Sequence, residues 1–244
     1  MPEAGRRPAY YAASRGGWRD WWTLLHPPYT AWHLSYVVIG ACLAPRVDTS
    51  RLVATLIAFF LAVGVAAHAI DELHGRPLRT TIPSSALVAV TAAGLAGAVV
   101  VGVIGLARVG IVLVPFIVVG PLLVLAYNAE LFGGIVHTTA GFAAAWGAFP
   151  VLTGYVAQTS DLRVSAVLAA GAAFALSWAQ RVLSTPARRI RRSTRSVEGS
   201  LTQADGTVVH LDESVLLKPL ETALRAMSWG MVALASALAV ARLT

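Results

Sequence analysis

The sequence predicts an all-α membrane protein, a polytopic bundle of about seven transmembrane helices with its N-terminus in the cytoplasm. Three observations support this prediction. Hydrophobic residues make up 57% of the 244 residues and charged residues only 13%, well below the roughly 25% charged residues of soluble domains. The mean hydropathy is +0.68. Lysine and arginine also concentrate in alternate loops, which places them on one side of the predicted membrane.

Apolar runs of about 20 residues, the length that crosses a bilayer, recur along the chain. The clearest run, 52–70, contains no charged residue. The alternation of polar and apolar positions that is typical of a membrane barrel does not occur, so the runs are predicted to be helices. The predicted spans are 30–44, 52–70, 84–106, 109–127, 136–156, 164–183 and 220–243.

The N-terminal segment 1–25 is predicted to be a cytoplasmic or interfacial arm. Its arginines are followed by Trp18, Trp21 and Trp22, a residue type that is enriched at membrane interfaces. The segment lacks the short apolar core and small-residue cleavage site of a signal peptide, so we expect it to remain part of the protein.

The rest of the chain divides into a membrane bundle and one polar segment. Residues 26–183 are predicted to form six helices of the bundle, and residues 219–244 the last helix. Residues 184–218 between them are polar and basic, which favours a cytoplasmic loop that lies on anionic headgroups. A small hairpin at Asp205-Gly206 is the alternative for this segment.

The charge distribution predicts the orientation and the location of the protein. The formal net charge is +7, but the basic residues are explained by loops on the inner side of a membrane, and no nucleic-acid partner is expected. The outer loops hold only Arg46, Arg51, Arg108 and Arg163. A multi-pass protein of the cell membrane is therefore predicted, with these basic residues inside: Arg6, Arg7, Arg15, Arg19, Arg76, Arg79, Arg188, Arg189, Arg191, Arg192, Arg195 and Lys218.

The second predicted span ends in a group of ionisable residues that are costly at the edge of a bilayer and are therefore functional candidates. His68, Asp71 and Glu72 are spaced i, i+3 and i+4, so a continuous helix presents them on one face. Two carboxylates favour Mg²⁺, and the addition of imidazole favours Zn²⁺ or iron as the alternative. The three residues are the predicted metal ligands. Charged residues are also common where a helix simply leaves the membrane, and this interpretation stays open.

Further candidates lie at the inner ends of other spans. Tyr127, Asn128 and Glu130 end the fourth span, and Gln180 lies near the end of the sixth. Under the predicted topology they share the membrane depth of Asp71. Glu130 is a candidate catalytic acid. Three other polar residues in this region are interpreted as structural or as extending to the interface: His33, His137 and Arg181.

The sequence around several of these residues resembles the motifs of a known protein family. The aspartate that ends the second span is followed by an Arg-Pro-Leu stretch, and the fourth span ends in a tyrosine. In this respect the chain is similar to the UbiA superfamily of intramembrane prenyltransferases, over roughly 26–185. The residues that the resemblance rests on are His26-Pro27-Pro28-Tyr29-Thr30, Gly40, Asp71, Arg76-Pro77-Leu78, Ile82 and Tyr127.

The resemblance implies a transfer of an isoprenyl group from an isoprenyl diphosphate to a lipophilic acceptor, with Mg²⁺ bridging carboxylates to the diphosphate. Asp71 and Glu72 would hold the metal. Together with Glu130, which is a candidate from its position alone, they are predicted to act in catalysis. Arg76 and Arg79 would contact the diphosphate. Three other residues are predicted to bind substrate: Tyr127, Asn128 and Gln180.

The end of the sixth predicted span departs from the family pattern. The family carries a second acidic motif there, whereas residues 177–186 contain no acidic residue. Two alternatives therefore stay open: a non-catalytic membrane scaffold or lipid-binding protein of UbiA-like fold, and a metal-dependent lipid enzyme that uses histidines and carboxylates. A homo-oligomer, or a neighbouring protein that supplies the missing groups, is also compatible with the sequence.

Overall fold

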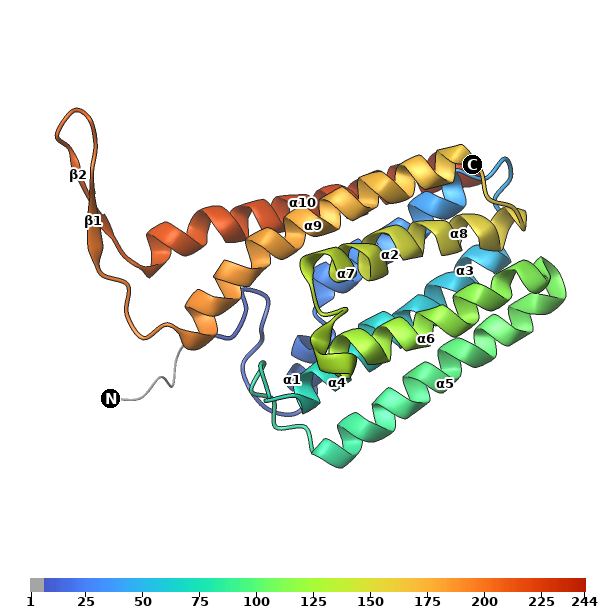
Figure 1. The fold of residues 1–244 in the computed structure, drawn as a ribbon, viewed down its shortest axis with the longest axis horizontal. Helices are drawn as coiled ribbons and strands as arrows, with labels where there is room; N and C mark the ends of the chain where they lie inside the picture. Colours follow the sequence, from blue (N-terminus) through green and yellow to red (C-terminus); the bar gives the residue numbers. More distant parts are fainter. Residues whose placement is uncertain (1–6) are drawn as a thin grey trace.

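The computed structural model describes residues 7–244 and is all-α except for one hairpin. Its long helices run alongside one another between two ends of an elongated bundle (Figure 1). The part of the chain that it describes contains six helical segments long and apolar enough to cross a membrane. They are Thr49–Leu73, Ser84–Val109, Ile111–Asn128, Thr139–Thr159, Val164–Ser193 and Glu213–Leu243.

Three of these segments change helix type along their length. Two contain a stretch of π-helix, a feature that is rare and often lies at functional sites. The first consists of α3 (Thr49–Phe59), the π-helix η1 (Phe60–Ala67) and α4 (His68–Leu73). The second consists of η2 (Ile111–Leu113) and α6 (Val114–Asn128). The third consists of α7 (Thr139–Ala143), the π-helix η4 (Ala144–Ala148) and α8 (Phe149–Thr159). The other spanning segments are α5 (Ser84–Val109), α9 (Val164–Ser193) and α10 (Glu213–Leu243).

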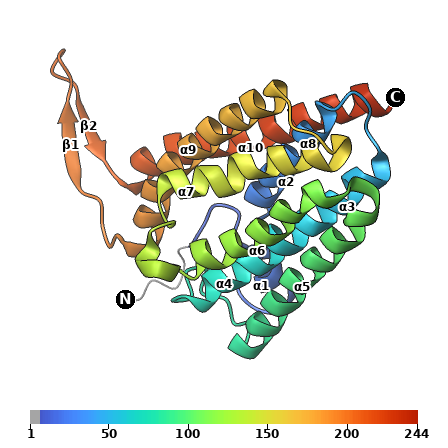
Figure 2. The same ribbon diagram turned by 45° about the vertical axis from the view of Figure 1, so that its right-hand side comes forward.

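The first predicted span, 30–44, forms the helix α2 (Pro27–Cys42). This helix begins at Pro27, because proline is tolerated in the first helical turn. Its 16 residues are fewer than the roughly 20 of a typical span. The helix lies within the bundle, in contact with α8 and α10 (Figure 2). Residues 7–244 thus form six helical segments of spanning length, and α2 is a shorter helix packed among them.

Glycines allow α2 and α8 to approach closely. A Cβ atom at Gly40 would overlap the carbonyl oxygen of Val151, and one at Gly154 would overlap that of Val37. Small residues at such crossings let helix backbones pack directly against each other in membrane proteins. This reciprocal contact fixes the position of α2 against α8.

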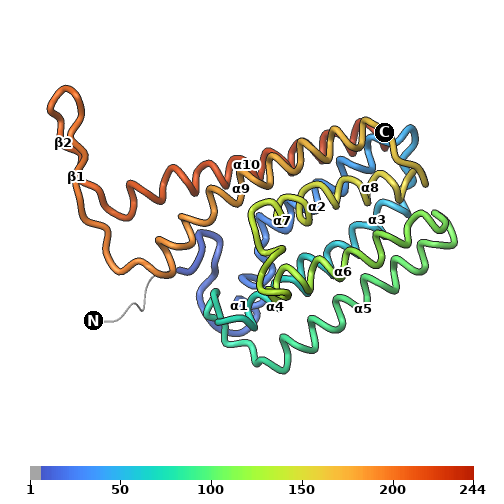
Figure 3. Tube along the Cα trace, in the orientation of Figure 1, coloured from blue at the N-terminus to red at the C-terminus, as the bar shows by residue number. Residues whose placement is uncertain are grey.

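The outer helices present apolar side chains outward, as a lipid-facing surface requires. In α5 only 11% of the most apolar window is buried, and Ile104 is 68% exposed. Helix α6 lies beside α5 at this side of the bundle (Figure 3). These two helices therefore form the outer layer on this side of the bundle, and α9 and α10 lie on the opposite side.

The polar segment predicted as a loop over 184–218 is largely ordered secondary structure. Helix α9 continues to Ser193, and α10 already begins at Glu213. Between them, β1 (Gly199–Thr202) and β2 (Val208–Leu211) form an antiparallel hairpin that projects from the bundle (Figure 1). The hairpin alternative at Asp205-Gly206 thus describes the segment better than the favoured loop, since Gly206 takes the positive φ of 85° that the turn requires.

The N-terminal arm contains a short helix, α1 (Trp18–Leu24), that is tied to the loop after α4. The Asp20 carboxylate accepts hydrogen bonds from the backbone N–H and the hydroxyl of Thr81, at 2.7 and 2.6 Å, and from the N–H of Gly16 at 2.9 Å. Burial alone would raise the pKa of Asp20, but these hydrogen bonds outweigh it and hold the pKa below its usual range. The ionised carboxylate therefore stabilises the attachment of α1.

This attachment is expected to weaken in acid. Because the folded-state pKa of Asp20 is lowered, its contribution is present above the unfolded-state pKa of about 3.9 and is lost as the pH falls through the lower folded value. A titration of tryptophan fluorescence from pH 6 to pH 2 should show this release as a transition, and Asp20→Asn should lack that transition. Asp205→Asn, in the exposed hairpin, is the matched control. An unchanged transition in Asp20→Asn would assign it to another group.

Candidate functional site

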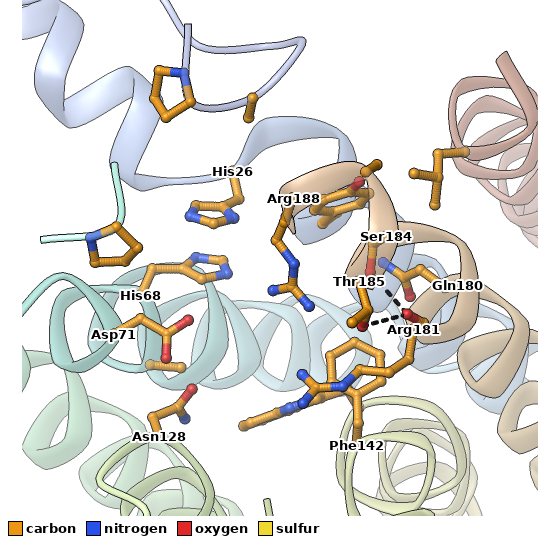
Figure 4. A pocket seen from close by; sticks show the side chains of 18 of the residues that line it. His26, His68, Asp71, Asn128, Phe142, Gln180, Arg181, Ser184, Thr185 and Arg188 are labelled. Carbon is orange, nitrogen blue, oxygen red and sulfur yellow. Dashed lines mark hydrogen bonds between the residues drawn. The ribbon is translucent and has the colours of Figure 1, made fainter. Parts of the chain in front are cut away.

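A cavity of about 340 Å³ opens at the end of the bundle where α4, α6 and α9 bring polar side chains together (Figure 4). Its wall comes from segments far apart in the sequence, including the N-terminal arm, the start of α2 and the start of α10. Up-and-down connection of the helices explains this convergence, because every second helix end returns to the same end of the bundle.

The basic side of the cavity is one face of α9. Arg181, Arg188 and Arg192 are separated by seven and four residues, a spacing that places side chains on the same face of a helix. All three line the cavity. Figure 4 shows Arg188 pointing into it, between the two histidines and Thr185.

Each arginine of this face has a different environment. The guanidinium of Arg181 lies over the rings of Tyr127 and Phe142, 5.6 and 5.5 Å from their centroids, which are cation–π distances. Arg192 donates from Nε to the carbonyl oxygen of Pro8 at 3.2 Å. Among residues 7–244, Arg188 has no hydrogen bond or ion pair. The guanidinium of Arg188 is therefore the one of the three most available to a ligand.

A fourth arginine of α9, Arg191, also reaches the cavity wall but is paired. It forms a two-pronged ion pair with Glu221 of α10, and the Nη2–Oε2 distance is 2.8 Å. The pair joins α9 to α10 and neutralises both charges at this position. Arg191 is consequently a structural residue of the site.

Two histidines stack on the opposite side. The rings of His26 and His68 are nearly parallel, with centroids 4.2 Å apart. Tyr11 shares a hydrogen bond of 2.8 Å with Nδ1 of His26, and Nδ1 of His68 lies 3.0 Å from the carbonyl oxygen of Gly64. Burial, and next the neighbouring His68, hold the pKa of His26 well below its usual value, so His26 is neutral at pH 7.

Asp71 provides the carboxylate of the cavity. Its side chain is partly buried, and in the described part of the chain it has no hydrogen bond or ion pair within 4 Å. The basic side chains across the cavity from it are Arg181, Arg188 and Arg192. Figure 4 shows Asp71 beside Asn128 and facing the arginines.

Several other predicted residues also line the cavity. Gln180 and Tyr127 belong to the cavity wall, and the buried Oε1 of Gln180 and hydroxyl of Tyr127 have no hydrogen-bond partner in the described chain. Asn128 donates from Nδ2 to the carbonyl oxygen of Val124 at 2.8 Å. Glu130 is mostly exposed and lies 3.8 Å from Nδ1 of His137.

Glu72 lies outside the cavity although it is adjacent to Asp71 in sequence. Its side chain is fully buried and accepts hydrogen bonds from the N–H groups of Leu78 and Thr80, at 2.9 and 2.8 Å, and from the hydroxyl of Thr80 at 2.8 Å. These contacts close the loop that follows α4. The structure therefore gives Glu72 a loop-stabilising position, not the position of a ligand in the cavity.

Arg76 and Arg79, predicted as diphosphate contacts, belong to the same loop and are not part of the cavity wall. Arg76 donates to the carbonyl oxygen of Ile82 at 2.5 Å and to the hydroxyl of Ser84 at 2.6 Å. Both arginines have positive φ angles, 52° and 57°. Basic side chains reach the cavity from α9 instead.

The predicted donors do not assemble into a metal site. Within the described residues, no group of three or more His, Cys, Asp or Glu side chains could hold a metal ion. Glu72 is occupied by the loop, which leaves His68 and Asp71 of the three predicted ligands facing the cavity. The residues present thus do not fit a preformed Mg²⁺, Zn²⁺ or iron centre, and each of these cofactors stays a prediction.

A second cavity of about 450 Å³ lies among α3, α5, α6 and α8, and its lining is mostly apolar. Val63 and Trp146 line both cavities. They belong to the π-helical segments η1 and η4. The polar cavity and the apolar cavity are therefore separated by a wall that includes these two side chains.

Sequence reasoning missed the arginine face and the stacked histidines. Hydropathy alone places Arg181 at the membrane interface and Arg188 and Arg192 in a loop. Their spacing would have indicated one helical face if α9 had been extended beyond its apolar portion. The His26–His68 stack joins distant segments and has no local signal.

No protein-family model matches the chain, and no curated protein or solved structure is significantly similar to it.

Proposed function

We propose that this chain is a divergent UbiA-like membrane prenyltransferase that acts on an isoprenyl diphosphate and a lipophilic acceptor. The observation that supports it most directly is the juxtaposition of an arginine-lined cavity and an apolar cavity that share Val63 and Trp146. Guanidinium groups suit phosphate oxygens, and an apolar cavity suits a hydrocarbon tail. An amphiphile with a charged head and an isoprenoid tail matches both.

In the proposed reaction, the bond between the allylic carbon and the diphosphate oxygen breaks, and the diphosphate leaves with the bonding electrons. The arginines of α9 stabilise the negative charge of the leaving group. The acceptor forms the new bond to the allylic carbon and loses a proton. Asp71, on the opposite side of the cavity, is the proposed base for that proton.

Asp71→Asn is expected to reduce prenyl transfer by about a hundredfold or more, because general-base catalysis contributes on that order. The measurement is the release of diphosphate from radiolabelled geranylgeranyl diphosphate, and the labelling of a lipid extract, by protein in nanodiscs. Asp161→Asn is the matched control, because Asp161 is an exposed carboxylate after α8, outside the cavity wall. Equal rates for the wild type and Asp71→Asn would contradict the role of Asp71.

A lipid-binding protein without catalytic activity is the second candidate, favoured by the limited set of carboxylates in the cavity. Glu221 is paired with Arg191, and Glu130 is mostly exposed, which leaves Asp71 as the partly buried, unpaired acid of the described cavity wall. Saturable binding of geranylgeranyl diphosphate without release of diphosphate, across a range of lipophilic acceptors, would favour this candidate over the enzyme.

We further propose that α2 is a seventh, short span and that the arginine-lined cavity faces the cytoplasm. Two arguments support this. Helix α2 is packed against α8 through Gly40 and Gly154, and α8 belongs to a segment of spanning length. The arginine-rich end of α9 follows the positive-inside rule when it lies in the cytoplasm.

A further inference from the structure

The cavity offers arginine side chains to an anion, whereas a metal-dependent site would use carboxylates that hold a metal ion. We infer that Arg181, Arg188 and Arg192 bind the phosphate groups of the ligand directly, and that binding requires no divalent cation. The inference rests on the proposed function for the identity of the ligand, an isoprenyl diphosphate. It replaces the magnesium bridge that the family resemblance implies.

The position of the arginines supports direct contact. They occupy one face of α9 over three turns, and all three side chains are partly buried in the cavity wall. A guanidinium group donates paired hydrogen bonds in a fork that matches two phosphate oxygens, and such charge-assisted bonds are stronger than neutral ones. Several guanidinium groups on one face offer donors to both phosphates of a diphosphate.

The fixed orientation of Arg181 adds to this arrangement. Its guanidinium packs over Tyr127 and Phe142, so its charge is held at the cavity wall before a ligand arrives. The unpartnered Tyr127 hydroxyl and Gln180 Oε1 show that the same wall has unused polar capacity. Little reorganisation of Arg181 is therefore needed on binding.

The acidic groups of the cavity cannot provide a matching set of metal ligands. Glu72 lies outside the cavity and is committed to Leu78 and Thr80, and Glu221 is paired with Arg191. Of the other acids in the wall, Glu130 is mostly exposed, and Asp71 faces the arginines. The Asp71 carboxylate therefore repels an arriving diphosphate.

The two modes of binding predict opposite effects of one substitution. With direct arginine contacts, Asp71→Asn removes a repulsive charge, and the affinity for geranylgeranyl diphosphate should rise about threefold to tenfold. With a magnesium bridge, the same substitution removes a metal ligand and should abolish binding. This contrast separates the modes without depending on turnover.

The experiment is calorimetric titration of the full-length protein in nanodiscs with geranylgeranyl diphosphate, in EDTA and in Mg²⁺. We expect binding in EDTA with an affinity close to that in Mg²⁺. Arg188→Gln should weaken it by on the order of tenfold to a hundredfold, since each hydrogen bond between charged groups contributes that much. Arg189→Gln, an exposed neighbour on the same helix outside the cavity wall, should bind like the wild type.

Binding that occurs only in Mg²⁺ and is lost in Asp71→Asn would overturn this inference and leave the proposed function standing. No binding in either condition would overturn both. If Arg188→Gln fails to fold, Arg181→Lys keeps the charge and alters the donor geometry. An unchanged affinity in that variant, together with unchanged binding by Arg192→Gln, would also overturn the inference.

Discussion

Glu72→Ala is expected to lower the free energy of unfolding by about 4 kcal/mol or more and to lower the melting temperature clearly. The substitution leaves three buried donors without an acceptor, and each unsatisfied buried donor costs about 1–3 kcal/mol. These donors are the N–H groups of Leu78 and Thr80 and the Thr80 hydroxyl. Thermal unfolding in a mild detergent, followed by tryptophan fluorescence, measures the effect.

Glu130→Ala is the control for this experiment, because Glu130 is an acid at the same end of the bundle whose side chain is 63% exposed. It should melt close to the wild-type temperature. The result that would contradict our account of Glu72 is a normal melting temperature combined with loss of ligand binding. Such a result would return Glu72 to the role of a ligand-binding residue that its sequence position suggested.

The second large effect is expected at the crossing of α2 and α8. Gly40→Ala places a methyl group against the backbone of Val151, and backbone cannot move aside as the end of a flexible side chain can. Overpacking of this kind costs about 3 kcal/mol. Gly154→Ala meets Val37 in the same way from the other helix. The measurement is again the melting temperature.

Glycines that face open space serve as controls for the crossing. A Cβ atom at Gly171 of α9 or Gly230 of α10 would have no neighbour within 4 Å. Alanine at these positions should be neutral or stabilise the helix by up to about 1 kcal/mol, because alanine has the higher helix propensity. Equal melting temperatures for Gly40→Ala and Gly171→Ala would show that α2 and α8 are not held this closely.

Much of the fold was predictable from hydropathy, because the bilayer imposes a length and a composition on each span. Six of the predicted spans correspond to helices of spanning length in the structure. Helix ends were harder to predict. Hydropathy reports the part of a helix that can lie in lipid, whereas α9 continues past it as a polar, amphipathic extension to Ser193.

The end of the bundle at which the site residues lie was predictable from the sequence, but the direction in which each side chain points was not. Alternating helices bring Asp71, Tyr127, Asn128 and Gln180 to one end of the bundle, and all four line the cavity. Glu72 shows the limit of this reasoning. Adjacent residues of a helix point about 100° apart, so only the packing of α4 determines that one carboxylate faces the cavity and the other faces the loop.

The hairpin of β1 and β2 offers a way to read out which compartment the cavity faces. It emerges between α9 and α10 at the same end as the arginines, and its turn at Gly206 is exposed and remote from the helices (Figure 1). Exposed turns of this kind tolerate insertions well. A short reporter tag inserted at Gly206, probed with an impermeant reagent on intact cells, therefore reports the sidedness of the cavity while the bundle remains unaltered.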